Sequence, residues 1–131
     1  MRTRMIGEFG ELPARLATPL ALVINELVTN AVEHRLGRRP GTVTLEARRT
    51  PGTEDGGPRL EVVVSDDGAG MDRPVVEESG AAAFRQAGPG EGLGMQIVRT
   101  LVASELDGTI RWAPREGGGT EVTVSVRLEE P

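Results

Sequence analysis

The sequence predicts an α+β two-layer sandwich in which helices cover one face of a mixed, mainly antiparallel sheet. Two segments repeat their apolar residues at helical spacing, and the segments that alternate apolar and polar residues come in adjacent pairs. The predicted order is strand, helix, strand, strand, loop, helix, strand, strand, which differs from the regular strand–helix alternation of a doubly wound parallel fold. With 131 residues, the chain is expected to form one domain over residues 1–131.

Two amphipathic helices follow from the apolar spacing. Residues 16–31 carry apolar side chains at steps of three and four, and Gly37 would close this helix. The helix starts either at Thr18–Pro19 or at Pro13, and with the second start Pro19 would kink the first two turns. The second helix begins at Leu93 and is closed by Asp107–Gly108. Its apolar face contains Leu93, Ile97, Val98, Leu101 and Val102.

The strands are predicted from alternation and from the turns between them. Residues 42–49 and 60–65 form two strands joined by a Pro-, Gly- and acid-rich hairpin connection at 50–58. Residues 109–113 and 120–128 form the last two strands, with a turn at 114–119. Residues 2–9 add an edge strand. Residues 71–91 have only weak periodicity, and so long a loop is typical of a lid.

Composition excludes several kinds of site. All 15 basic residues are arginine, so the chain has neither a P-loop lysine nor a Schiff-base lysine. It has no cysteine and one histidine, His34, which excludes disulfides, zinc–thiolate sites and multi-histidine metal sites. A net charge of -5 argues against binding nucleic acid or an anionic membrane surface. The longest mainly apolar stretch, 16–24, is too short to span a bilayer, and we expect a cytoplasmic protein without direct membrane contact.

Polar residues on the first helix could hold a metal. Glu26, Asn30 and either Glu33 or His34 are spaced so that they share one stripe, which we place opposite the apolar one. An amide oxygen beside a carboxylate suits a hard divalent cation that keeps waters and bound phosphates, as Mg²⁺ does. A solvated polar face is the alternative.

Three short motifs lie at predicted element ends. In DDGAG (66–70), Asp66 could accept a hydrogen bond from an exocyclic amine while Gly68 and Gly70 let the chain approach a flat ring. GEGLG (90–94) opens the second helix, whose free N–H groups favour phosphate oxygens. It does not follow a strand, so it is not a dinucleotide-binding fingerprint. Each motif alone could be an ordinary turn, as could Gly118–Gly119–Thr120. Four independent accidents are a poor explanation for the order in which Asn30, Asp66, Gly92 and Thr120 lie, each at the predicted end or face of a different element.

Four stretches of the sequence resemble a known family. These are LVINELVTNAVEH, VVVSDDGAGM, GEGLGMQIV and GGGTEVTVSV. They resemble the N, G1, G2 and GT boxes of the GHKL ATPase superfamily, at 25–34, 66–70, 90–94 and 118–120. Within it, the chain looks like the catalytic ATP-binding domain of a bacterial sensor histidine kinase, in a form suggesting soluble or HWE-like relatives. The resemblance implies the GHKL fold with a flexible ATP lid at about 71–91.

The resemblance also implies residue roles at the phosphates. Asn30 would coordinate the Mg²⁺ that bridges the phosphates, and Glu26 would assist transfer. His34 would line the nucleotide or pack structurally; its use as the phosphoacceptor is the less favoured alternative. Contacts with the phosphates would come from Gly92, Leu93 and Gly94. Glu33 stands where many members carry a basic residue, which puts one phosphate contact in doubt; Arg35, Arg73 or Arg85 could replace it.

At the adenine end, the resemblance implies that Asp66 accepts a hydrogen bond from the adenine amino group. Gly68 and Gly70 would shape the adenine pocket, and Thr120 would support this end through its hydroxyl or a water. Phe84 alone remains of the aromatic-rich lid motif of many histidine kinases, so we expect a loosely ordered lid without nucleotide.

The implied function is transfer of the ATP γ-phosphoryl group to a histidine on a separate dimerisation domain, for relay to a response regulator. Phosphoryl transfer needs positioning and charge stabilisation more than covalent chemistry, which suits these residues. The parent would be a homodimer, and this domain alone would not autophosphorylate. The alternatives are a free-standing GHKL serine kinase that binds a sigma factor and a nucleotide-gated dimerisation module of the topoisomerase or mismatch-repair type. A purely structural domain would leave the four boxes unexplained.

Overall fold

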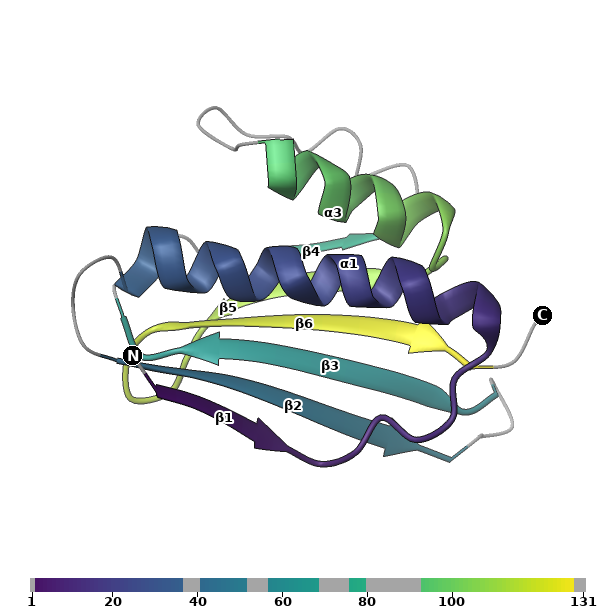
Figure 1. The fold of residues 1–131 in the computed structure, drawn as a ribbon, viewed down its shortest axis with the longest axis horizontal. Helices are drawn as coiled ribbons and strands as arrows, with labels where there is room; N and C mark the ends of the chain where they lie inside the picture. Colours follow the sequence, from purple (N-terminus) through teal and green to yellow (C-terminus); the bar gives the residue numbers. More distant parts are fainter. Residues whose placement is uncertain (1, 37–40, 52–56, 69–75, 80–92, 129–131) are drawn as a thin grey trace.

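In the described part of the chain the fold has two layers, with two α-helices on the same face of a six-stranded sheet (Figure 1). The computed structural model describes residues 2–36, 41–51, 57–68, 76–79 and 93–128. The elements along the chain are β1 (Arg2–Ile6), α1 (Ala14–Asn30), the π-helical turn η1 (Ala31–Leu36), β2 (Thr42–Thr50), β3 (Arg59–Asp66), β4 (Val76–Ser79), α3 (Leu93–Ser104), β5 (Thr109–Pro114) and β6 (Thr120–Arg127). The predicted α+β sandwich is therefore confirmed.

The sheet is mixed and mainly antiparallel, as predicted. Its strand order is β1-β2-β3-β6-β5-β4, and β1 pairs with β2 in parallel while the other four pairs are antiparallel. The inward positions of β6 are buried and alternate with half-buried polar ones because successive side chains point to opposite faces. This alternation places Val122, Val124 and Val126 under the helices.

Two predictions about the elements need correction. The stretch 71–91 was expected to be loop throughout, but Val76–Ser79 form the edge strand β4, whose Val76 pairs with Trp112 of β5. The prediction failed because β4 is only four residues long and its partner lies far along the chain. The rest of the predicted lid lies outside the described residues. The predicted N-terminal strand is also shorter than expected and ends at Ile6.

Helix α1 takes the earlier of the two predicted starts. It begins at Ala14 after Pro13, whose carbonyl oxygen accepts from the Leu16 and Ala17 N–H groups at 2.9 and 3.2 Å. Pro19 therefore lies inside the helix and removes one backbone donor near its start. After Asn30 the helix widens into η1, which the sequence did not predict.

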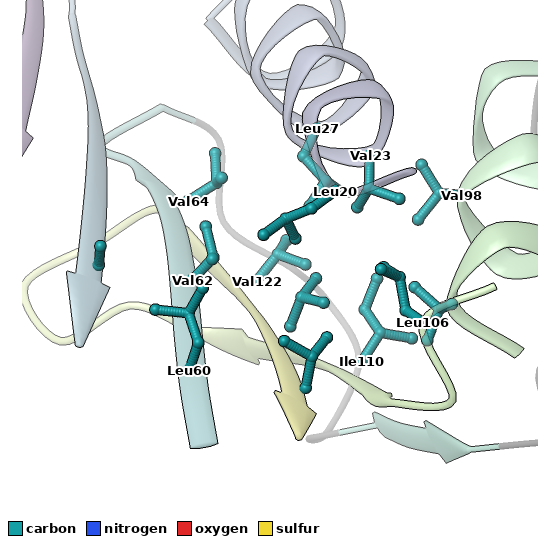
Figure 2. Packing of buried hydrophobic residues seen from close by; sticks show 14 of the residues in the cluster. Leu20, Val23, Leu27, Leu60, Val62, Val64, Val98, Leu106, Ile110 and Val122 are labelled. Carbon is teal, nitrogen blue, oxygen red and sulfur yellow. The ribbon is translucent and has the colours of Figure 1, made fainter. Parts of the chain in front are cut away.

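The core lies between the helix layer and the sheet. Figure 2 shows Leu20, Val23 and Leu27 of α1 directed towards Leu60, Val62 and Val64 of β3, with Val98 of α3 beside Val23. Helix α3 also places Arg99, only 5% exposed, over β5, with its guanidinium carbon 4.8 Å from the centroid of the Trp112 ring. Asp107 takes a positive φ of 46° after α3, close to the predicted helix end.

Among the helices that the structure describes, none combines the length and apolar character required to cross a bilayer.

Candidate functional site

The described residues among the predicted nucleotide contacts lie at one end of the two-layer sandwich. At this end α1 finishes, α3 starts, β3 finishes and β6 starts, because α1 and α3 run in opposite directions and β3 is antiparallel to β6 (Figure 1). Four segments that are far apart in the sequence are thereby brought to the same edge of the fold. They are the segments in or beside which the sequence predicts the N, G1, G2 and GT boxes.

Asp66 and Thr120 form the buried part of this end. They are paired residues of β3 and β6, so their side chains project from the same face of the sheet, the one covered by the helices. Asp66 is 3% exposed and Thr120 is 1% exposed. The Gly68 N–H donates to Asp66 Oδ1 at 3.0 Å, so one carboxylate oxygen helps to turn the chain after β3. Aspartate and threonine are mostly exposed in folded proteins, so their joint burial here marks this end of the sheet as a candidate site.

The Thr120 hydroxyl is unusual in a second respect. Its Oγ1 is buried and has no hydrogen-bond partner within the described part of the chain. A buried polar atom without a partner is destabilising, and such atoms are rare in folded proteins. A nucleotide or a water held at this end would supply the partner, so the orphaned hydroxyl fits the predicted adenine site.

Gly119 joins the GT segment to the G1 segment. Its φ is +98°, and a Cβ there would overlap the Asp66 carbonyl oxygen and lie 2.7 Å from the Asp66 carbonyl carbon. Only glycine combines this backbone conformation with this close approach. Asp67 adds a further link, since its Oδ1 accepts from the Thr42 N–H at 2.8 Å and ties the end of β3 to the start of β2. The Asp66 backbone is therefore held by both neighbouring strands.

Glu26 and Asn30 lie on the last turns of α1, one turn apart and both half-buried. The polar stripe was predicted to lie opposite the apolar face. Instead, Glu26 is directed towards α3, and its carboxylate fills the space beside Gly94. Glu33, one turn further on, is exposed. Among the residues that the structure describes, no group of three or more His, Asp and Glu side chains could hold a metal.

Several predicted site residues cannot be placed. Gly70 and Gly92 lie outside the described residues, and the side chains of His34 and Leu93 are not described although their backbones belong to η1 and α3. The structure brings together Glu26 with Gly94, and Asp66 with Gly68 and Thr120. The contacts of Glu26 with Gly94 and of Gly119 with Asp66 are not predictable from local patterns, because each joins residues more than 50 positions apart. The run of three glycines at 117–119 was the one local signal.

Comparison with known proteins identifies the family. A model of histidine kinase-, DNA gyrase B- and HSP90-like ATPases matches residues 16–130. The sensor histidine kinase PdtaS of Mycolicibacterium smegmatis is 40% identical over 133 aligned residues, which cover 98% of this chain. The chain spans only 23% of the length of that relative.

Solved structures agree with this result. The histidine kinase domain of the blue-light activated kinase EL346 from Erythrobacter litoralis matches with a TM-score of 0.71 at 29% identity, covering 97% of this chain and 54% of that one. The catalytic domain of the histidine kinase ThkA matches with a TM-score of 0.69 at 20% identity, covering 96% and 77%, and supports the fold. The chain belongs to the family of histidine kinase-, DNA gyrase B- and HSP90-like ATPases and is an ATPase domain of the sensor histidine kinase type.

Proposed function

We propose that this domain binds Mg·ATP and transfers the γ-phosphoryl group to a histidine on a dimerisation domain of the parent protein. The observation that carries the proposal is the buried pair Asp66 and Thr120 at the end of β3 and β6, with a Thr120 hydroxyl that lacks a partner among the described residues. Because the matched family consists of ATPases, ATP is the ligand that we propose for this polar end.

Asp66 and Thr120 select adenine in this proposal. A carboxylate is a pure acceptor with room for several hydrogen bonds, so Asp66 can take the Gly68 N–H and an exocyclic amine together. The Thr120 hydroxyl bonds the ring directly or through a water. Gly68 and Gly70 leave space for the flat base. Gly119 supports the arrangement because it lets β6 approach the Asp66 carbonyl group.

Asn30 and Glu26 act at the phosphate end. The Asn30 side-chain oxygen is the proposed Mg²⁺ ligand, and Glu26, one turn earlier on α1, assists transfer. When bound, Mg²⁺ neutralises phosphate charge and orients the phosphoryl group. In a chain without lysine, we assign the remaining phosphate contacts to Gly92, Leu93 and Gly94. Leu93 and Gly94 begin α3, where unpaired N–H groups and the helix dipole favour anions.

The phosphoacceptor lies outside this chain in the proposal. The only histidine, His34, belongs to η1 beside the end of α1, and we assign it to lining the nucleotide. The relative PdtaS is named as a sensor histidine kinase, which favours a histidine acceptor over the serine kinase alternative. The parent protein would be a cytoplasmic homodimer that passes the phosphoryl group to a response regulator.

The full-length parent protein tests this function when incubated with Mg²⁺ and γ-labelled ATP. We expect label that is lost in acid and retained in base, as for phosphohistidine, and no label on an Asp66→Ala variant. Thr123→Val, on the opposite face of β6 from Thr120, is the matched control and should label normally. Acid-stable label would instead indicate a serine or threonine acceptor, and an absence of label on the wild type would contradict the proposal.

A further inference from the structure

Glu26 and Gly94 make a close contact between α1 and α3. A Cβ added to Gly94 would overlap Glu26 Oε2 and would lie 3.1 Å from the carboxyl carbon of Glu26 and 3.8 Å from its Oε1. The carboxylate therefore occupies the position that any larger residue at 94 would need for its side chain.

The backbone conformation does not explain why residue 94 is a glycine. Gly94 is the second residue of α3, and it is not among the described glycines with positive φ. Within a helix, glycine is the poorest choice after proline, so alanine would be favoured there if space allowed. Contact with Glu26 is the one steric reason for glycine that the described residues provide.

Both ends of the contact are fixed by buried neighbours. On α1, Val23 and Leu27 flank Glu26 and are 0% and 2% exposed. On α3, Met95 packs against the core and Val98 is fully buried beside Val23, as Figure 2 shows for the two valines. Because neither helix can easily shift, a side chain at 94 would displace the flexible carboxylate. The contact therefore sets where the Glu26 carboxylate lies.

We infer that Gly94 is a positioning residue for Glu26: its missing side chain lets the Glu26 carboxylate lie at the first turn of α3, one turn of α1 before Asn30. A negative charge is favourable at a helix N-terminus, which helps to hold it there. In this view the missing side chain of Gly94 serves the Glu26 carboxylate, while its backbone N–H keeps the phosphate contact proposed above. The inference rests on the proposed function for its kinetic consequence, whereas the steric pairing itself is independent of ATP.

A double-mutant cycle on the full-length parent protein tests the pairing. The variants are Gly94→Ala, Glu26→Ala and both together, and the measurements are the autophosphorylation rate at saturating Mg·ATP, the Kd for Mg·ATP and the Tm without nucleotide. We expect Gly94→Ala to lower the rate at least about tenfold, because a displaced Glu26 carboxylate no longer assists transfer, while Kd stays within about twofold. Thr100→Ala, at an exposed position on α3, is the control and should change none of the three.

The cycle distinguishes the possible roles of Gly94. If Gly94 acts through Glu26, the double variant transfers at the rate of Glu26→Ala alone, and Gly94→Ala raises the Tm more in the Glu26→Ala background than in the wild type. A further loss of rate in the double variant would show that Gly94 acts on the nucleotide itself and would overturn the inference. An unchanged autophosphorylation rate for Glu26→Ala would also overturn the inference.

The Tm readout separates this inference from the proposed function. If the wild-type protein is not labelled by ATP, the proposed function fails, but the Tm cycle still reports whether residues 26 and 94 are coupled. Equal Tm changes for Gly94→Ala in both backgrounds would refute the steric pairing whatever the activity of the protein.

Discussion

Replacing Thr120 by valine should stabilise the domain and weaken nucleotide binding at the same time. The side chain is 1% exposed, and its Oγ1 lacks a hydrogen-bond partner in the described part of the structure. Valine has nearly the same shape and is equally suited to a strand. The substitution therefore removes an unsatisfied polar atom from the nucleotide-free state, and it removes a hydrogen-bonding group from the bound state.

The size of both effects follows from the burial of the hydroxyl. An unsatisfied buried polar group destabilises by roughly 1–3 kcal/mol, and we take the lower value, about 1 kcal/mol, for a small hydroxyl. A domain of 131 residues has an unfolding entropy near 275 cal/mol/K at about 2.1 per residue, so the Tm should rise by about 4 °C. Loss of one hydrogen bond of about 0.7–1.4 kcal/mol should raise the Kd for Mg·ATP about threefold to tenfold.

Thermal unfolding without nucleotide and titration calorimetry with Mg·ATP measure the two effects. Thr120→Ser retains the hydroxyl and should keep the wild-type affinity. Thr123→Val, three residues along the same strand and half-buried on the opposite face, should leave the affinity unchanged. A lower Tm for Thr120→Val would mean that the hydroxyl is already satisfied, and an unchanged Kd would mean that it does not contribute to binding; either result would refute the reasoning.

Further substitutions test the rest of the site and one surface ion pair. Asn30→Ala should abolish magnesium-dependent nucleotide binding without unfolding the domain; unaltered affinity for Mg·ATP in calorimetry would defeat this. Asp66→Ala should weaken ATP but not inorganic triphosphate, and equal losses would exclude an adenine role. Gly119→Ala should lower the unfolding free energy measured in urea by roughly 2 kcal/mol or more, well beyond Gly118→Ala, which has a similar positive φ but no atom near its Cβ. Hydrogen bonding from Arg48 lowers the pKa of Glu46, so this pair stabilises the fold above the ordinary glutamate pKa of about 4.3 and loses its effect as the pH falls through the lowered value. Because the Arg48 side chain is 54% exposed, Glu46→Gln should reduce the unfolding free energy at pH 7 by less than about 1 kcal/mol. The reduction should be smaller still in acid. A reduction that does not depend on pH would contradict the coupling between the Glu46 pKa and stability.

Much of the fold could be predicted because it follows from local spacing of apolar residues in the sequence. The helical spacing of Leu20, Val23 and Leu27 and the alternation in β6 both report which side of an element is buried, and the structure buries those sides. Strand β4 and the turn η1 could not be predicted in this way. The four residues of β4 carry no full alternation, and they form a strand because Trp112 and its neighbours in β5 supply the hydrogen-bonding edge.

The sequence indicated which residues form the candidate site, but it did not indicate which of them contact one another. Asp66 and Thr120 could be singled out because each lies at the end of a predicted strand, yet their direct pairing depends on the register of β3 against β6. The position of Glu26 is a clearer case. Helical spacing placed it on a polar stripe, but its contact with Gly94 depends on how α1 packs against α3, which no local pattern specifies.

Hydrogen–deuterium exchange of this domain with and without Mg·ATP tests the central claim most directly. The account predicts that Mg·ATP protects backbone amides at the end of the sandwich where α1 finishes and α3 begins, including those around residues 30, 66–68 and 119–120. Amides in the hairpin half of β2 and β3 at the opposite end should exchange unchanged. No protection, or protection confined to that opposite end, would contradict a nucleotide site built around Asp66 and Thr120.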